Sequence, residues 1–193
     1  MYIDVSKFQG VIDWKKVAQN KEKVTGVILR STTKDGGLDY QLINNYNGVL
    51  QNMSDVKELS VYKFSYAYNY ADARIEAKRT LDSLASVGVH YDMFYLDLEK
   101  GDTAYTQKSA DEVIHAYRDE LFMRGMLGRF ALYINYDYLK IIIHPSWRRE
   151  RIWLARYNSV MGDTFGANVV LWQYTSTGKV NGINGNVDCS REV

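Results

Sequence analysis

Apolar and polar positions follow two different periods along the chain. Short runs rich in Val, Ile, Leu, Tyr and Phe have the length and composition of β-strands. These runs lie at Tyr2–Val5, Gly26–Arg30, Leu59–Tyr66, Met93–Leu98, Gly128–Ile134, Arg151–Ala155, Val169–Tyr174 and around Val187. Between the early runs, apolar residues recur at helical spacing, as in the stripe formed by Ile75, Leu81, Leu84 and Val87. The pattern predicts strands that alternate with helices, two of which begin after the capping residues Asp13 and Thr106.

The order of these segments predicts the fold class. Alternating strands and helices imply parallel strands joined by right-handed crossovers, and eight candidate strands suggest a closed β/α barrel. The last three strands begin only about 18 residues apart, which is barely enough for a strand and a crossover helix. We therefore expect a single domain over residues 1–193. Its expected fold is a small, irregular TIM-like β/α barrel, with about five β/α units followed by three strands with few helices.

Composition and charge indicate which classes of binding partner are not expected. Hydrophobic residues make up 46% of the chain and charged residues 24%, as in ordinary globular proteins. The net charge is +1 and the charges are scattered, so neither a nucleic-acid partner nor a membrane partner is expected. No apolar run approaches the roughly 20 residues of a membrane span.

The first residues and the cysteine content bear on localisation. Tyr2–Val5 already has the pattern of a strand, and no signal peptide opens the chain. Either the protein is made without a Sec signal or the signal has been removed. The single cysteine, Cys189, permits no intramolecular disulfide, which suits synthesis in the cytoplasm.

The stretch Phe94–Glu99 is the most informative part of the sequence. An apolar strand ends there in two carboxylates, Asp97 and Glu99, which share one face because side chains on a strand alternate. Two carboxylates on one face raise the pKa of one of them, so that an acid and a carboxylate can coexist at one pH. A solvated strand end is the simpler interpretation of this pair taken alone.

The barrel prediction brings further acids to the same place. Chemistry in β/α barrels occurs at the carboxyl ends of the strands. Asp4 lies near the end of the first strand and Asp188 at the end of the last, and these two strands are neighbours in a closed barrel. We therefore expect Asp4, Asp97, Glu99 and Asp188 at one mouth.

Aromatic residues make up 13% of the chain, and several lie at predicted strand ends. For these residues, sugar binding and core packing are about equally expected. The candidate substrate-binding residues are Tyr62, Tyr133, Trp153, Tyr157, Trp172, Gln173 and Tyr174. The three histidines, His90, His115 and His144, lack metal-ligand spacing, so we expect neither a metal nor a cofactor.

Taken in order, the motifs resemble the glycoside hydrolase family 25 muramidases, the lysozymes common among bacteriophage endolysins and bacterial cell-wall hydrolases. The resemblance covers essentially the whole chain. It is carried by Asp4–Trp14, Arg30–Thr32 with Asp39 and Asn45, Tyr62–Phe64, Leu96–Glu99, Trp153–Tyr157 and the long block Trp172–Asp188. Lys63 stands where a histidine is common in the family. The resemblance implies hydrolysis of the β-1,4 bond between N-acetylmuramic acid and N-acetylglucosamine in peptidoglycan. It also implies action on the bacterial cell wall, reached by secretion or by phage-encoded release through a holin.

Glycoside hydrolysis assigns roles to the acids. Glu99 is the expected proton donor, because Asp97 and an aromatic, partly apolar mouth should both raise its pKa. Spacing alone does not fix the stereochemistry, since carboxyl groups two residues apart on a strand can adopt either separation used by glycosidases. We favour a substrate-assisted, retaining reaction in which Asp97 steers the acetamide; a direct Asp97 nucleophile is the alternative. Asp4 and Asp188 are assigned to positioning and pKa tuning.

Two other functions fit parts of the pattern. A metal-dependent nuclease could hold divalent ions with Asp97 and Glu99, but a net charge of +1 offers little of the basic groove that such an enzyme needs. A catalytically inactive wall-binding module would not need both carboxylates.

Overall fold

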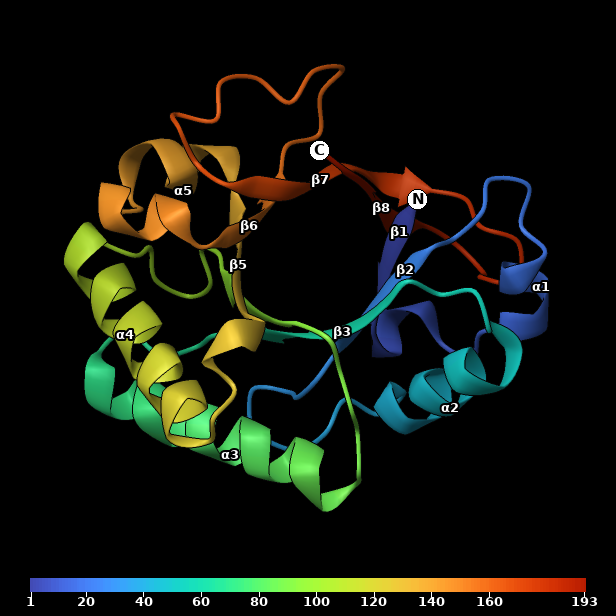
Figure 1. Ribbon diagram of the computed structural model, residues 1–193, viewed down its shortest axis with the longest axis horizontal. Helices are drawn as coiled ribbons and strands as arrows, with labels where there is room; N and C mark the ends of the chain where they lie inside the picture. The colour runs from blue at the N-terminus through green and yellow to red at the C-terminus, as the bar shows by residue number, and fades with distance from the viewer.

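The computed structural model describes residues 1–193, and its eight strands close into a barrel in chain order (Figure 1). The strands are β1 (Tyr2–Val5), β2 (Gly26–Arg30), β3 (Glu58–Phe64), β4 (Phe94–Leu98), β5 (Phe130–Asn135), β6 (Arg151–Ala155), β7 (Val169–Gly178) and β8 (Val187–Glu192). The α-helices are α1 (Trp14–Ala18), α2 (Leu42–Asn52), α3 (Tyr70–Ser86), α4 (Gln107–Met123) and α5 (Tyr136–Ile141). Three short 3-10 helices are η1 (Lys7–Gln9), η2 (Leu127–Arg129) and η3 (Pro145–Arg149).

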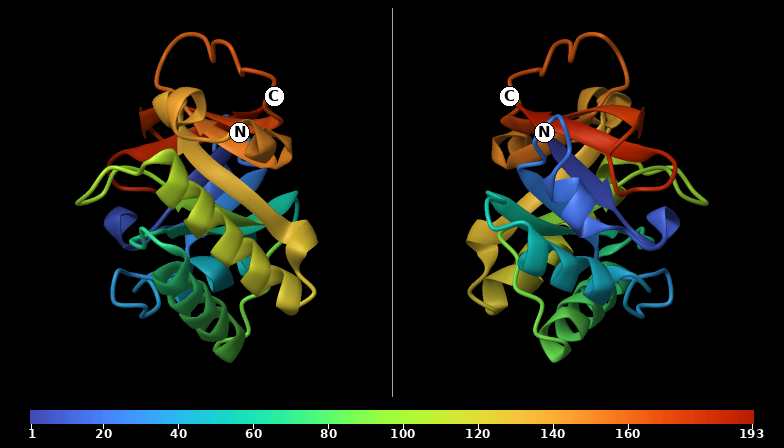
Figure 2. Two further views of the ribbon diagram at one scale, coloured as in Figure 1. Left: turned by 90° about the vertical axis from the view of Figure 1, so that its left-hand side faces the viewer. Right: turned by 90° about the vertical axis from the view of Figure 1, so that its right-hand side faces the viewer.

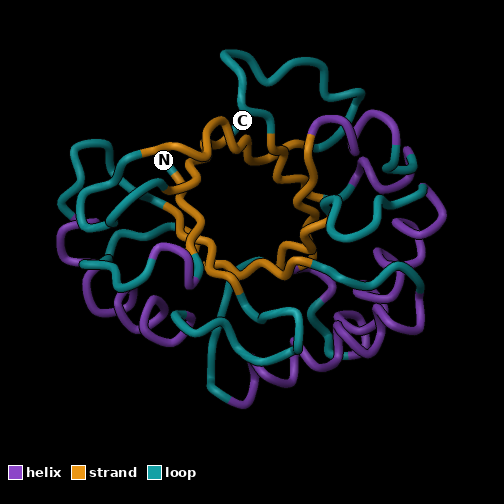
Figure 3. Tube along the Cα trace, turned by 180° about the vertical axis from the view of Figure 1, so that it is seen from behind, coloured by secondary structure: helices purple, strands orange, loops and turns teal.

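The predicted fold class is confirmed. Each of the strands β1 to β5 is followed by one α-helix, whereas no α-helix follows β6, β7 or β8. Figure 3 shows the consequence: helices surround much of the ring of strands, and loops cover the side near the C-terminus. None of the helices has both the length and the apolar composition that crossing a membrane requires.

The expectation that all strands run parallel is wrong for β8. It pairs antiparallel with both β1 and β7, while every other neighbouring pair is parallel. The chain between Gly178 and Val187 is shorter than the dozen or so residues that a parallel crossover needs, so β8 turns back along β7. Pairing of β1 with β8 also brings the two termini to the same side of the molecule (Figure 2).

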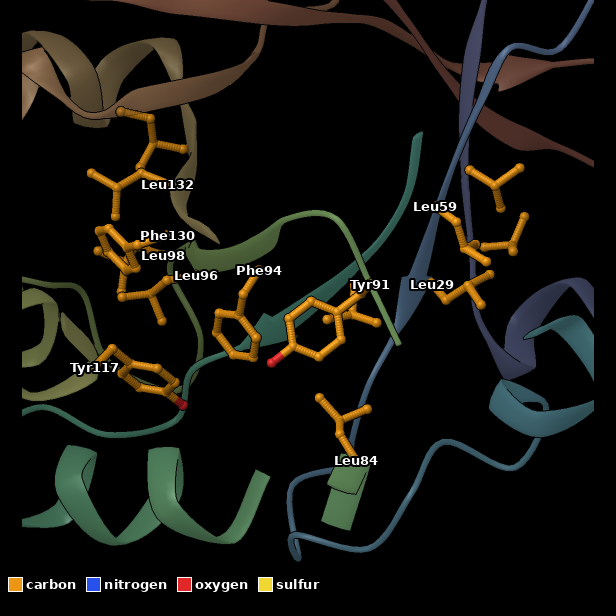
Figure 4. Packing of buried hydrophobic residues seen from close by; sticks show 14 of the residues in the cluster. Leu29, Leu59, Leu84, Tyr91, Phe94, Leu96, Leu98, Tyr117, Phe130 and Leu132 are labelled. Carbon is orange, nitrogen blue, oxygen red and sulfur yellow. The ribbon is translucent and has the colours of Figure 1, made fainter. Parts of the chain in front are cut away.

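Side-chain alternation along the strands creates two apolar layers. One lies inside the barrel and contains Tyr95, Tyr133, Trp153 and smaller residues. The other, much larger layer fills the space between the barrel and its helices. On β4, Phe94 belongs to this outer layer, and its ring centroid lies 5.9 Å from that of Tyr117 on α4 (Figure 4). Burial of such aromatic and aliphatic side chains supplies most of the driving force for folding.

The predicted N-caps are present, whereas the predicted apolar stripe is only partly buried. The side chains of Asp13 and Thr106 accept hydrogen bonds from the backbone amides of Lys16 and Ser109, as N-caps do. Ile75 on α3 is exposed, however, and so is Val87, which follows the end of this helix. The buried face of α3 is formed by Ala73, Ala77, Thr80, Leu81 and Leu84, small residues included, because close helix packing favours short side chains there.

A buried ion pair joins α3 to β3. The Lys63 side chain points out of the barrel, is 0% exposed, and places its Nζ 3.3 Å from Glu76 Oε1. Lys63 also donates to the Thr33 carbonyl at 3.2 Å. Glu76 accepts further hydrogen bonds from the Ser65 hydroxyl (2.8 Å), the Tyr66 amide (3.0 Å) and the Tyr117 hydroxyl (2.9 Å). Burial lowers the pKa of Lys63, and the charge of Glu76 opposes that shift. The pair therefore holds two charges away from water and depends on both partners being present.

Replacing Lys63 by alanine should lower the free energy of unfolding by about 3–5 kcal/mol, because the change leaves the Glu76 charge without its cation. Urea denaturation followed by circular dichroism measures the effect. The matched control is Lys57→Ala, which removes an exposed lysine just before β3 and should leave stability unchanged. A Lys63 variant as stable as this control would contradict the assigned role.

Candidate active site

A cavity opens at the end of the barrel where β1 to β7 finish and β8 begins. Its volume is about 180 Å³. The lining residues are Asp4, Arg30, Tyr62, Phe64, Asp97, Glu99, Tyr133, Trp153, Tyr157, Gln173 and Asp188. All four predicted acids therefore meet in one place, together with Tyr62, Tyr133, Trp153, Tyr157 and Gln173 from the predicted binding set.

The strands explain why the acids converge. Asp97 lies on β4 with its side chain directed into the barrel, and Glu99 follows β4 on the same face. Asp4 on β1 is the register partner of Asp188 on β8. Asp188 was expected at the end of its strand, but it is the second residue of β8. It still reaches the mouth because β8 runs in the opposite direction, so that its first residues lie beside the last residues of β1.

Gln173 connects the acids to the aromatic side of the cavity. Its Nε2 donates to Asp4 Oδ2 at 2.9 Å. Its Oε1 accepts from the Tyr133 hydroxyl at 2.9 Å and from the Tyr157 hydroxyl at 2.7 Å. A carboxamide carries a donor NH₂ group and an oxygen that can accept two hydrogen bonds, so Gln173 fixes the positions of three neighbours at once.

The pKa values of all four acids are raised, and burial is the largest cause in each case. For Asp97 the charge of Glu99 adds to the effect, and for Asp4 the charge of Asp188 does. A contact with the Tyr133 hydroxyl works against the raised pKa of Glu99. The surroundings of the mouth therefore raise the proton affinity of its acids, as general acid catalysis requires.

Asp97 differs from the other three acids in its surroundings. The positive charges of Arg30 and Lys63 lower its pKa against the larger effect of burial, whereas no cation acts in this way on Glu99. Asp97 Oδ1 is buried and has no hydrogen-bond partner. A buried acceptor without a donor costs free energy, so this oxygen is suited to receive an N–H group from a bound molecule.

Two of the predicted binding residues lie elsewhere. Trp172 and Tyr174 do not line the cavity. Because Gln173 points into the barrel, its two neighbours on β7 point outward. The indole of Trp172 is buried there, donates to the Arg156 carbonyl at 2.8 Å and lies 4.4 Å from the guanidinium of Arg191. These contacts assign Trp172 to packing rather than to substrate.

Trp153 forms part of the floor of the cavity and of the inner core at the same time. Its indole Nε1 donates to the Ser190 hydroxyl at 2.9 Å. Its ring centroid lies 4.4 Å from that of Tyr133 and 6.4 Å from that of Tyr62, in edge-on contacts. Trp153 thereby holds the two tyrosine rings that line the cavity.

The cavity also contains Arg30 and Phe64, which the sequence analysis did not assign to the site. Arg30 is the last residue of β2, and its guanidinium donates to the Tyr66 hydroxyl at 3.0 Å. Strand alternation from the buried, inward-facing Ile28 could have indicated its direction. No group of three or more His, Cys, Asp or Glu side chains is arranged to hold a metal ion.

A closed barrel with paired, partly dehydrated carboxylates at its mouth is the arrangement of a glycoside hydrolase. The sequence profile described as glycosyl hydrolases family 25 matches residues 3–183, and the chain belongs to this family. No match was found among curated proteins.

Several solved structures have the same fold as this chain. The modular autolysin LytC of Streptococcus pneumoniae, solved in complex with a synthetic peptidoglycan ligand, superposes with a TM-score of 0.83 at 26% identity. The match covers 98% of this chain and 45% of the autolysin, so this chain spans less than half the length of that protein. The bacterial lysozyme of Streptomyces coelicolor matches with a TM-score of 0.74 at 20% identity, over 98% of this chain and 90% of that one. The catalytic domain of endolysin ply40, from bacteriophage P40 of Listeria monocytogenes, has the same TM-score and identity, with coverage of 100% and 92%.

The raised pKa of Asp97 predicts a gain in stability when its charge is removed. A carboxyl whose pKa is higher in the folded state stabilises fully below its unfolded pKa, and this contribution is lost as the pH rises through the folded value. At pH 7, Asp97→Asn should therefore raise the free energy of unfolding by about 1–2 kcal/mol. The difference from the unmodified protein should narrow as the pH falls toward about 4.

Chemical denaturation at a series of pH values tests this expectation. Asp35→Asn, which changes an exposed aspartate outside the cavity, is the control and should follow the unmodified protein throughout. An Asp97→Asn protein that is less stable at pH 7 would show that the ionised carboxylate stabilises the fold.

Proposed function

We propose that this protein is an N-acetylmuramidase that hydrolyses the β-1,4 bond between N-acetylmuramic acid and N-acetylglucosamine in peptidoglycan. The observation that carries the proposal is the pair Asp97 and Glu99 at the mouth end of β4, with both pKa values raised. Membership of glycosyl hydrolases family 25 supports it, as does similarity to an autolysin that was solved with a peptidoglycan ligand.

Glu99 acts as the general acid in this proposal. Its carboxyl is less buried than that of Asp97, lines the cavity and is close enough to Tyr133 for hydrogen bonding. Burial and the charge of Asp188 favour the protonated form. A protonated carboxyl at the open side of the cavity can reach the glycosidic oxygen of a sugar that enters from solvent.

Asp97 acts on the acetamide group of the substrate. Its unpartnered Oδ1 accepts the acetamide N–H, and the positive charge of Arg30 supports negative charge on the carboxylate. This contact turns the acetamide oxygen toward the anomeric carbon and stabilises the cation that forms when the oxygen attacks. Asp4 and Asp188 are held in place by Gln173 and by their strand pairing. Because the four acids titrate together, these two influence the pKa values of Asp97 and Glu99.

The reaction then proceeds in two balanced displacements. Glu99 gives its proton to the leaving oxygen as the glycosidic bond breaks, and the acetamide oxygen bonds to the anomeric carbon from the opposite face. The resulting oxazolinium ion is opened by water, which Glu99, now a carboxylate, deprotonates. Two inversions give net retention and restore the acetamide and the Glu99 proton. Tyr62 and Tyr157 provide aromatic surface for the sugar rings.

The site of action in the proposal is the bacterial cell wall. Synthesis in the cytoplasm, followed by secretion or by release during phage lysis, would bring the enzyme to this substrate. The reaction as proposed needs no metal or cofactor, because both displacements use groups of the chain and of the substrate.

Product analysis tests the reaction. Digestion of purified peptidoglycan should release fragments with new reducing ends at N-acetylmuramic acid, and proton NMR should detect the β-anomer first. EDTA should not change the rate. Reducing ends at N-acetylglucosamine, or peptides released from intact glycan, would disprove the muramidase assignment, and wall binding without any release would favour an inactive wall-binding module.

Substitution of the acid tests the mechanism. Glu99→Gln should lower turnover by about 10²–10⁴-fold, the usual contribution of general acid catalysis, while folding and wall binding persist. Asp97→Asn should also be severely impaired. Asp188→Asn is the comparison within the site: it should lose less activity and mainly shift the pH profile. Near-normal turnover by Glu99→Gln would remove Glu99 as the proton donor.

A further inference from the structure

The rim of the mouth over β1 and β2 carries exposed apolar side chains. Val11 is 84% exposed, Tyr40 79% and Phe8 74%, the highest values among the large hydrophobic residues of the chain. Phe8 and Val11 lie between β1 and α1, and Tyr40 lies between β2 and α2. Both connections follow the carboxyl ends of their strands, so these residues lie at the end of the barrel where the cavity opens.

Two cations are held among these rings. Lys7 Nζ lies 5.3 Å from the centroid of Phe8 and 5.4 Å from that of Tyr40. The guanidinium carbon of Arg30 lies 5.9 Å from the Phe8 centroid, and Arg30 also lines the cavity. Arg30, Phe8, Lys7 and Tyr40 therefore form a continuous row that leads outward from the cavity, which we call the cationic rim.

Neither cation of the rim takes part in a salt bridge. The chain contains ten salt bridges, and they involve neither Lys7 nor Arg30. Cation–π contacts hold a positive charge in place without neutralising it. A single exposed lysine or aromatic residue has no special meaning. Lys7, which has no ion-pair partner, lies beside Arg30 on a shared aromatic surface at the edge of the mouth, and this arrangement indicates a place for an anion outside that mouth.

The rim is built rigidly. The Ser6 hydroxyl accepts from the Phe8 amide at 3.2 Å, and the Gln9 side chain accepts from the Ser6 amide at 2.9 Å, which closes a capping box around η1. Gly10 follows with φ of 64°, a conformation that a side chain would strain. Lys7 and Phe8 are thus positioned before any ligand arrives, which reduces the entropy lost on binding.

We propose that the cationic rim binds the carboxylates of the peptide stem that muramic acid carries in peptidoglycan, with Phe8 and Tyr40 packing against the stem's apolar atoms. The inference rests on the proposed function, because it identifies which part of that substrate lies outside the cavity. Neutral glycan could stack on the rings but would leave Lys7 without an anion. A carboxylate of an acidic peptide would pair with Lys7, and the positive charge of Arg30 nearby adds to the attraction.

Hydrolysis of two matched substrates tests the proposal. One is intact peptidoglycan, and the other is the same glycan after an amidase has removed its stems and the lactyl carboxylates that this exposes have been converted to amides. Lys7→Met keeps the length and apolar character of the side chain but removes the charge. It should lower kcat/KM on intact peptidoglycan by about 3–5-fold, the upper end of the effect of one partly exposed ion pair, and by less than about twofold on stripped glycan. Lys7→Arg should restore the preference. Lys57→Met, at the opposite end of the barrel, is the control.

A binding measurement keeps the test independent of catalysis. NMR titration with N-acetylmuramyl-L-alanyl-D-glutamyl-L-lysine should perturb the amide signals of Lys7, Phe8 and Tyr40, and Lys7→Met and added salt should both weaken binding. Equal losses on both substrates, or no loss with Lys7→Met and no perturbation at the rim, would overturn the proposal. A protein that hydrolyses neither substrate but binds the muramyl tripeptide at the rim would refute the proposed function and leave this inference standing.

Discussion

Asp4, Asp97, Glu99 and Asp188 share one partly dehydrated mouth, and the free energy needed to hold negative charge there shapes its surroundings. Like charges would separate if the backbone allowed it. The closed ladder of strands prevents this, because the strand register fixes Asp4 opposite Asp188. Neighbours then offset part of the cost in different ways: the carboxamide of Gln173 donates to Asp4, while the charge of Arg30 acts on Asp97. The rigid barrel therefore holds the acids in the proximity on which the reactivity of the mouth depends.

Much of this arrangement could be predicted from the sequence. The apolar runs located all eight strands, and their spacing predicted that the last three would have few helices. Strand alternation placed Asp97 and Glu99 on one face, and barrel closure brought Asp4 and Asp188 together even though the direction assumed for β8 was wrong. That prediction survived because Asp188 lies at the mouth end of its strand in the antiparallel arrangement that the short preceding turn requires.

Other features depend on contacts that sequence patterns do not contain. In the sequence, Trp172 has the pattern of a sugar-binding residue. In the structure Gln173 points into the barrel, so its neighbour Trp172 lies on the outer face of β7. A lysine is usually expected to be exposed to solvent. Lys63 is nevertheless buried, because Glu76 on α3 lies close enough to form an ion pair with it. Strand alternation could indicate that Arg30 points into the barrel, but it does not reveal that the charge of Arg30 acts on Asp97. Each depends on which partner the fold brings near, and spacing along one segment does not encode that.

The pairing of β1 with β8 has a consequence for the order of events during folding. The hydrogen bond from the Tyr2 hydroxyl to Glu192 joins residues 190 positions apart. Contacts of such high sequence separation form late and slow the folding of barrels. During synthesis, helices α1 to α4 and their parallel strands can associate as they leave the ribosome, whereas the ring stays open until the residues of β8 emerge. Until then Asp188 is missing from the mouth, so a nascent chain cannot assemble the complete set of acids before translation has reached β8.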